Sequence, residues 1–325
     1  MKVPLKKFIE LILIKDWRNS LKMDIDKLTT EMRNVKSMNL DTLLPVEIVE
    51  LMNEENKNII YAIDEIKEDI GHMITEVIKA FNNGGRLIYI GAGTSGRLGI
   101  LDAVECPPTF GTDPEMVQGL IAGGSDAIYE AQEGAEDSKE LAIEDLKKIK
   151  LNEKDVLIGL AASGRTPYVI GGIEYANEIG STTGAIACNK NSDIGKISDI
   201  KMEAVVGPEV LTGSTRLKSG TVQKIICNMI STGSMVGIGK IYENLMIDVK
   251  QTNEKLNRRA ENILMEITGV NRDFARKNLD DCNKDLKLAS LHILSDLDID
   301  ECRELLKESK GHLRKALELA NNNDK

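Results

Sequence analysis

Aromatic residues are scarce in this 325-residue chain, and its 42 basic residues are outnumbered by 52 acidic ones. Phe, Trp and Tyr together make up 3% of the residues, and the formal net charge is −10 at pH 7. Proteins that bind single-stranded nucleic acid stack bases on aromatic rings, and those that bind the phosphate backbone need a cationic surface. We therefore expect no nucleic-acid partner, although a small anion can still bind locally.

Metal-binding and disulfide patterns are also missing from the sequence. The three histidines, His72, His292 and His312, are far apart, and the five cysteines include no CxxC pair. Scattered cysteines of this kind are typical of reduced thiols in a cytosolic protein. We expect a cytoplasmic protein with no metal and no cofactor. A zinc site assembled from distant residues stays open as an alternative.

Long apolar runs are absent as well. The apolar stretch at residues 8–14 is interrupted by Glu10, is far shorter than a membrane span and has no small-residue cleavage site after it. We expect neither a membrane segment nor a signal peptide. Residues 1–22 are interpreted as an N-terminal extension, either a frayed helix or the result of a start codon placed too early, with Met23 as the alternative start.

The periodicity of apolar residues indicates the fold class. Between residues 45 and 83 they recur at helical spacing, which predicts one or two amphipathic helices. Short apolar runs then predict five buried parallel strands, with helical stretches such as 138–150 and 167–179 between them. This alternation predicts a three-layer αβα sandwich around a five-stranded parallel sheet. The five expected strands are residues 86–92, 116–122, 155–162, 182–188 and 202–206.

The strand signal ends near Leu211. Residues 214–240 predict one long helix, and the chain from residue 251 onward has only helical patterns. We therefore expect an α/β domain at 23–250 and a C-terminal all-helical module at 251–325.

Glycine and hydroxyl residues follow two of the expected strands. The sequence GAGTSGR occupies residues 91–97, and ASGRT occupies residues 162–166. Glycines let the backbone approach an anion, and the hydroxyls and free amides at a helix start donate to it. Ligands of parallel sheets bind at the carboxyl ends of strands beside the topological switch point. A third hydroxyl-rich segment at 212–220 adds donors and cations, so the pattern predicts a phosphate site.

Two other interpretations of these loops remain open. Each loop alone can be an ordinary β-α turn with a helix cap. The first loop also begins like a dinucleotide-binding GxG, but Arg97 stands where the third glycine should fall.

Two glutamates lie near these loops in the sequence. Glu105 immediately precedes Cys106 and two prolines, which we expect to end the helix and to hold Glu105 at a rigid corner. Glu136 lies at the start of a later helix, where an acid is commonly a dipole partner or a cap. Cys106 is a poor candidate nucleophile because no histidine is near it in the sequence.

Five motifs occur at or near the expected strand ends and helix starts: GAGTSGR at 91–97, ECPPTF at 105–110, EGAED at 133–137, ASGRTPY at 162–168 and LTGSTRLKSG at 211–220. Together they resemble the N-acetylmuramic acid 6-phosphate etherase family. The resemblance also includes residues 28–34 (LTTEMRN) and 244–249 (NLMIDV), and it leaves out only about the first 22 residues. The family has the sugar isomerase (SIS) fold and is related to glucokinase regulatory proteins, and its tail resembles a ubiquitin-associated three-helix module.

The resemblance implies a carbon–oxygen lyase that acts on a phosphosugar in amino-sugar catabolism and peptidoglycan recycling. The family pairs two glutamates, which in this chain are Glu105 and Glu136. We assign Glu105 as the acid for the leaving group and Glu136 as the base. The expected phosphate ligands are Thr94, Ser95, Ser163 and Thr166, with Arg97, Arg165 and Lys218 as further substrate ligands.

The resemblance also implies a homodimer, because SIS domains typically pair across their sites and can share residues between subunits. Two other functions remain open. A non-catalytic phosphosugar sensor has the same fold but usually contains two copies of it. A phosphosugar isomerase shares the enolising chemistry but needs no acid for an ether oxygen.

Overall fold

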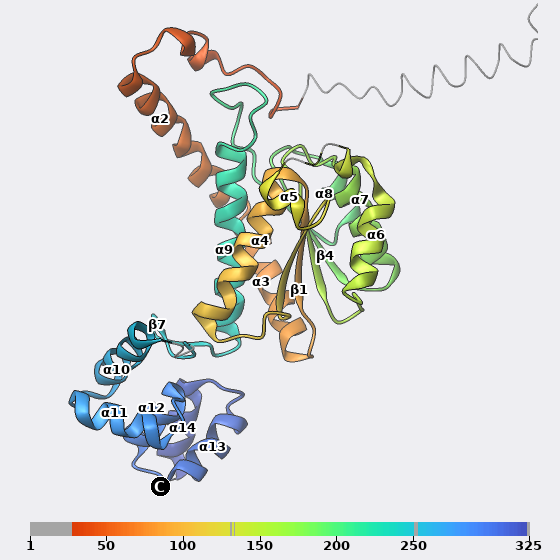
Figure 1. Cartoon of the computed structure of the whole chain (residues 1–325). Coiled ribbons are helices and arrows are strands. Elements are labelled where there is room, and N and C mark those ends of the chain that lie inside the picture. The colour runs from red at the N-terminus through yellow and green to blue at the C-terminus, as the bar shows by residue number, and fades with distance from the viewer. Residues whose placement is uncertain (1–27, 131, 133, 250–252, 324–325) are drawn as a thin grey trace, which may run out of the picture.

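The computed structural model describes residues 28–130, 132, 134–249 and 253–323, which form an α/β sandwich with a helical appendage (Figure 1). The expected N-terminal extension lies outside the described residues. Five parallel strands form the central sheet in the order β2-β1-β3-β4-β5, which confirms the predicted fold class. The strands are β1 (Leu87–Gly91), β2 (Val117–Ile121), β3 (Val156–Leu160), β4 (Thr182–Ala187) and β5 (Ile200–Glu203).

The register of the strands brings their carboxyl ends together. Gly91 at the end of β1 pairs with Leu160 at the end of β3 and with Ile121 at the end of β2. The chain leaves β1 toward β2 on one side and returns to β3 on the other, so the topological switch point lies between β1 and β3. The loops that follow β1 and β3 therefore start side by side, as the sequence predicted.

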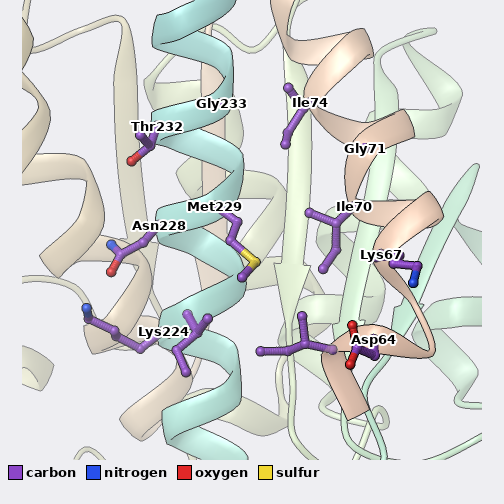
Figure 2. Close-up of a pocket in the computed structure, with 12 residues that line it drawn as sticks. Asp64, Lys67, Ile70, Gly71, Ile74, Lys224, Asn228, Met229, Thr232 and Gly233 are labelled. Carbon is purple, nitrogen blue, oxygen red and sulfur yellow. The ribbon is translucent and has the colours of Figure 1, made fainter. Parts of the chain in front are cut away.

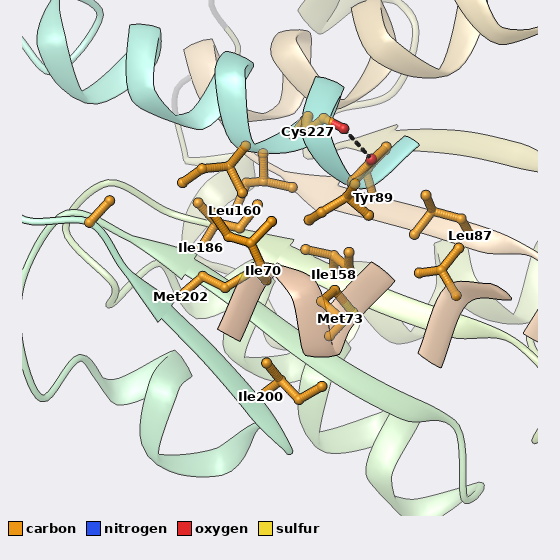
Figure 3. Close-up of a cluster of buried hydrophobic side chains, with 14 of the residues drawn as sticks. Ile70, Met73, Leu87, Tyr89, Ile158, Leu160, Ile186, Ile200, Met202 and Cys227 are labelled. Carbon is orange, nitrogen blue, oxygen red and sulfur yellow. Dashed lines mark hydrogen bonds between the residues drawn. The ribbon is translucent and has the colours of Figure 1, made fainter. Parts of the chain in front are cut away.

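Helices cover both faces of the sheet. On one face lie α3 (Lys67–Asn82), α4 (Gly93–Phe110) and α9 (Lys218–Gly237), packed on alternate strand residues such as Tyr89 and Ile158. Figure 3 shows this core, in which the Tyr89 hydroxyl donates to the Cys227 carbonyl at 3.3 Å. On the other face lie α6 (Lys139–Lys148), α7 (Pro167–Glu178) and α8 (Asp193–Ile197). The short α5 (Asp126–Tyr129) follows β2.

The first long helix, α2 (Pro45–Asp64), projects from the sandwich beside the start of α9 (Figure 1). Its buried residues are Glu55 and three apolar residues of its second half, whereas Val46 and Val49 in its first half are exposed. The predicted helical region at 45–83 is thus two helices, α2 and α3. The rest of this chain covers the first half of α2 only partly.

The expectation that the prolines end α4 is wrong. The helix continues through Pro107 and Pro108 to Phe110 and closes at Gly111, which has a left-handed φ of 63° and donates its N–H to the Pro107 carbonyl at 3.0 Å. The missing proline donors affect only the final turns, and burial of Cys106 and Phe110 holds those turns on the core. Glu105 is therefore an exposed residue within a helix and not a residue at a corner.

Two other boundaries differ from the sequence prediction. β5 starts two residues earlier than expected, at Ile200. α9 starts at Lys218, so the hydroxyls at 212–215 lie in the loop before the helix. That loop contains positive-φ Gly213, and Glu209 caps the helix by accepting from the Lys218 and Ser219 amides at 3.1 and 2.9 Å.

The C-terminal region is helical, but it has more helices than the three-helix resemblance implied. A hairpin of β6 (Ile241–Tyr242) and β7 (Leu245–Met246) precedes the helical region. Lys287 of the helical region contacts the segment just after α9, where its Nζ donates to the Gly239 carbonyl at 2.9 Å. Residues 250–252 lie outside the described residues, so the boundary at 250 stays a prediction. Residues 253–323 contain α10 (Glu254–Thr268), α11 (Arg272–Asp281), α12 (Leu286–Ser295), α13 (Ile299–Glu308) and α14 (Leu313–Asn323).

None of the helices in the described part of the chain has the length and apolar character of a membrane-spanning segment.

Candidate active site

The loop after β1 brings the first turn of α4 directly onto the end of the strand. A Cβ on Gly96 would lie 2.6 Å from Ile121 Cγ1 and 2.8 Å from the Gly91 carbonyl oxygen, so only glycine fits. Thr94 and Ser95 lie in this first turn, whose amides have no partners within the helix. The predicted strand, glycine turn and helix start is confirmed, and its free donors lie at the carboxyl edge of the sheet.

The loop after β3 supplies the second set of predicted ligands. Gly164 has φ +74°, and a Cβ there would lie 2.3 Å from Ser192 Cβ. Ser163 Oγ accepts from the Arg165 amide at 3.3 Å, and Thr166 is the residue before the first turn of α7, which begins at Pro167. The structure thus brings Ser163 and Thr166 to the same edge of the sheet as Thr94 and Ser95.

A small pocket joins Glu136 to the β1 loop. Its volume is about 140 Å³, and Gly93, Arg97, Gln132 and Glu136 are among the residues that line it. Glu136 comes from a 3-10 turn, η4 (Ala135–Asp137), that follows positive-φ Gly134. Arg97 donates from Nε to the Ile128 carbonyl at 2.8 Å, which orients its guanidinium. A carboxylate and a guanidinium therefore lie beside the first turn of α4.

Glu105 is at the other end of the same helix. It lies twelve residues after Gly93 in α4, which is about 18 Å along the helix axis at 1.5 Å per residue. Figure 1 shows α4 running from the carboxyl edge of the sheet toward the opposite edge. One chain therefore does not bring the two predicted catalytic glutamates together.

Lys218 forms a buried ion pair. Its side chain is 2% exposed, and Nζ lies 2.7 Å from Glu55 Oε2 of α2. Glu55 also accepts from Asn34 Nδ2 at 2.8 Å and from Lys36 Nζ at 2.9 Å. Burial acts to raise the pKa of Glu55, but the hydrogen bonds from Lys218, Lys36 and Asn34 outweigh burial and lower it to about 2. Lys218 thus has a carboxylate partner where the sequence predicted a substrate anion.

The remaining predicted cation, Arg165, stays partly exposed. Its Nε lies 3.8 Å from Asp193 Oδ2, a distance that leaves its donors available at the surface of the loop.

Two residues near the site were not predicted. Asn189 follows β4 and donates from Nδ2 to the Ala162 carbonyl at 3.1 Å and to Thr30 Oγ1 at 3.2 Å. Gln223 on α9 accepts from Ser95 Oγ at 2.8 Å. The position of Asn189 at a strand's carboxyl end was a usable signal, whereas nothing in the sequence marks Gln223.

The match of a family model places the central part of the chain in the SIS class of domains. A family model described as the glucokinase regulatory protein N-terminal SIS domain matches residues 69–177. Among solved structures, a phosphoheptose isomerase from Neisseria gonorrhoeae is 14% identical, with a TM-score of 0.44, and the match covers 58% of this chain and all of that one.

Curated relatives define the family more narrowly. An N-acetylmuramic acid 6-phosphate etherase from Bacillus cereus (strain AH187) is 55% identical over 293 residues, which cover 90% of this chain and 100% of the relative. One from Geobacillus sp. (strain WCH70) is 54% identical over 294 residues, with the same coverage. The chain belongs to the N-acetylmuramic acid 6-phosphate etherase family.

Proposed function

We propose that this protein cleaves the D-lactyl ether of N-acetylmuramic acid 6-phosphate and releases N-acetylglucosamine 6-phosphate and D-lactate. The observation that carries the proposal is 55% identity to a curated etherase over that relative's whole length. The sensor alternative has less support, because the regulatory-protein model matches only residues 69–177. The activity serves amino-sugar catabolism and cell-wall recycling.

The chemistry needs an acid and a base. In the open-chain sugar, the ether oxygen on C3 is β to the C1 aldehyde, so removal of the C2 proton allows lactate to leave. Water then adds to C3 of the unsaturated aldehyde. A base must move the C2 proton and later activate water, and an acid must protonate the departing oxygen. Carboxyl groups suit both roles.

We assign the phosphate to the paired loops. Thr94 and Ser95 offer hydroxyls from the first turn of α4, and Ser163 and Thr166 offer them from the β3 loop. The dipole and free amides at the start of α4 add positive potential. Arg97 and Arg165 can meet the second anionic group of the substrate, the lactyl carboxylate. Lys218 contributes indirectly, by holding the start of α9 against α2 through Glu55.

Glu136 acts as the base in this assignment, because its pocket adjoins the phosphate loop. Glu105, the assigned acid, reaches the departing ether oxygen from a second copy of the chain. Its neighbours on the exposed side of α4 are apolar, with Leu101 46% and Val104 58% exposed, as at a subunit interface. In an isologous dimer, each chain would contribute its Glu105 to the site of the other chain, which would complete two sites.

A groove between α3 and α9 supports the dimer. Figure 2 shows Ile70 and Ile74 of α3 facing Met229 of α9 across a pocket of about 790 Å³. The apolar side chains of one copy can fill the groove of the other. The protein works in the cytoplasm in this account, which agrees with five buried, free cysteines.

The direct test is incubation with N-acetylmuramic acid 6-phosphate and assay of D-lactate. We expect the wild type to release D-lactate without added nucleotide. If it releases none, the proposed function is wrong. The two glutamates are separated by exchange of the C2 proton with solvent. Glu105→Gln should retain exchange and lose lactate release, whereas Glu136→Gln should lose both. Equal loss of exchange in the two variants would contradict the assigned roles.

A further inference from the structure

Gln223 is a fully buried side chain with only half of its hydrogen-bonding capacity used. It lies on α9 and is 0% exposed. Its Oε1 accepts from Ser95 Oγ at 2.8 Å, while its Nε2 has no hydrogen-bond partner among the described residues. A buried amide donor without a partner is uncommon and costly, which points to a role beyond packing.

The position of Gln223 connects it to the proposed phosphate loop. Ser95 is in the first turn of α4 and is itself only 8% exposed. The same turn touches the start of α9, since a Cβ on Gly220 would lie 3.3 Å from Thr94 Cγ2. Gln223 therefore lies directly behind a hydroxyl that we assign to the substrate's phosphate.

The present hydrogen bond conflicts with phosphate binding. A serine hydroxyl has one proton, and Ser95 gives it to Gln223 Oε1. A phosphate dianion offers only acceptors, so Ser95 must turn its proton toward the phosphate and then needs a donor behind it. The unpartnered Nε2 is such a donor, and the oxygen and nitrogen of a carboxamide differ little in size.

We propose that Gln223 is a positioning residue for the phosphate of the substrate. Its carboxamide reverses when phosphate binds, so that Nε2 donates to Ser95 Oγ and the Ser95 proton points to a phosphate oxygen. The reversal gives Nε2 a partner in Ser95 Oγ and fixes the direction of the hydroxyl, while Oε1 takes the position that has no partner among the described residues. This inference rests on the proposed function, because it requires phosphate at the β1 loop.

The test is a double-mutant cycle of Gln223→Met and Ser95→Ala, with KM and kcat measured separately. Methionine keeps the volume and removes the donor. We expect KM to rise about tenfold in Gln223→Met with kcat within about threefold, because a hydrogen bond to the phosphate contributes equally to ground-state and transition-state binding. In the Ser95→Ala background the same substitution should change KM less than about twofold.

A second variant keeps the test informative if methionine perturbs folding. Gln223→Glu retains an acceptor for Ser95 but has no donor and adds negative charge, so it should raise KM more than Gln223→Met does. Ser234→Ala is the matched control, since Ser234 is a buried polar residue of α9 far along the helix from the loop. It should leave KM unchanged. Thermal unfolding of each variant checks that it is folded.

An unchanged KM in both Gln223 variants would overturn the inference, as would independent, multiplying effects of Gln223→Met and Ser95→Ala. Inorganic phosphate separates this outcome from failure of the proposed function. If the wild type releases no lactate but binds phosphate, about tenfold weaker binding by Gln223→Met supports the inference and equal binding refutes it. A wild type that neither releases lactate nor binds phosphate refutes both.

Discussion

At the scale of single residues, the ion pair between Glu55 and Lys218 connects three distant parts of the chain. Glu55 comes from α2 and Lys218 from the start of α9. Asn34, in the N-terminal segment 28–34, donates a hydrogen bond to Glu55. Both charged side chains are almost fully buried, at 5% and 2% exposed. Removing one partner of a buried pair leaves the other charge unpaired, which costs far more than replacing both partners.

We expect Glu55→Gln to lower the free energy of unfolding by about 3–5 kcal/mol. The double variant Glu55→Met with Lys218→Met should recover most of this loss. Urea denaturation of the three proteins measures both effects. Equal destabilisation in the single and double variants would show that the loss of stability does not come from leaving Lys218 unpaired.

The same pair predicts a dependence of stability on pH. The pKa of Glu55 falls from an ordinary value of 4.5 to about 2 in the folded protein. Its contribution to stability is therefore complete above about pH 4.5 and is lost as the pH falls through about 2. Glu55→Gln should show a smaller loss of stability over this acid range than the wild type.

The sequence predicts the positions of some residues of the proposed site but not the contacts of others. The positions of Thr94, Ser95, Ser163 and Thr166 at the carboxyl edge of the sheet could be predicted, because glycine and hydroxyl motifs follow strand ends. The environment of Lys218 could not, because its partner Glu55 is 163 residues away in the sequence. The same holds for Gln223, whose contact with Ser95 exists only once α9 packs against α4.

At the scale of elements, α4 determines the geometry of the site. Its first turn belongs to the proposed phosphate loop, and its last turns carry Glu105. The sequence predicted a helix here but ended it at the prolines, because proline removes a donor and restricts the residue before it. Packing of Cys106 and Phe110 on the core outweighs those local effects. The length of α4 could therefore not be read from local rules.

The close contact between α4 and β1 can be tested at Gly96. The Cβ of Gly96→Ala would lie 2.6 Å from Ile121 Cγ1 and 2.8 Å from the Gly91 carbonyl, so the first turn must shift. We expect a loss of about 1–3 kcal/mol in the free energy of unfolding. Gly71→Ala is the control, because nothing lies within 4 Å of the added methyl group. A Gly96→Ala protein as stable as the wild type would contradict the described packing.

At the scale of the whole molecule, the two glutamates that we propose as acid and base lie apart in a single chain. The proposed phosphate loops and Glu136 lie at one end of α4, and Glu105 lies about 18 Å away along the helix. The exposed apolar residues of α4 and the groove between α3 and α9 provide the surface on which a second copy can complete it. The sequence predicted both glutamates through family resemblance, but helix length alone shows their separation.

Mixed dimers test this arrangement. Coexpressed Glu105→Gln and Glu136→Gln chains should give about one quarter of wild-type activity, because half of the random dimers are mixed and each has one intact site. Glu140→Gln, an exposed glutamate of α6, is the control partner. Activity no higher than that of the separate variants would show that both glutamates act from one chain.

The most direct measurement of the central claim is the fate of solvent atoms during turnover. In a mixture of H₂¹⁸O and D₂O, elimination followed by water addition should place ¹⁸O on C3 and deuterium on C2 of N-acetylglucosamine 6-phosphate. The ether oxygen should leave with D-lactate, which gains no ¹⁸O at its hydroxyl. Label in the lactate hydroxyl and none on C3 would mean that the lactyl carbon is attacked directly, and the elimination mechanism would be wrong.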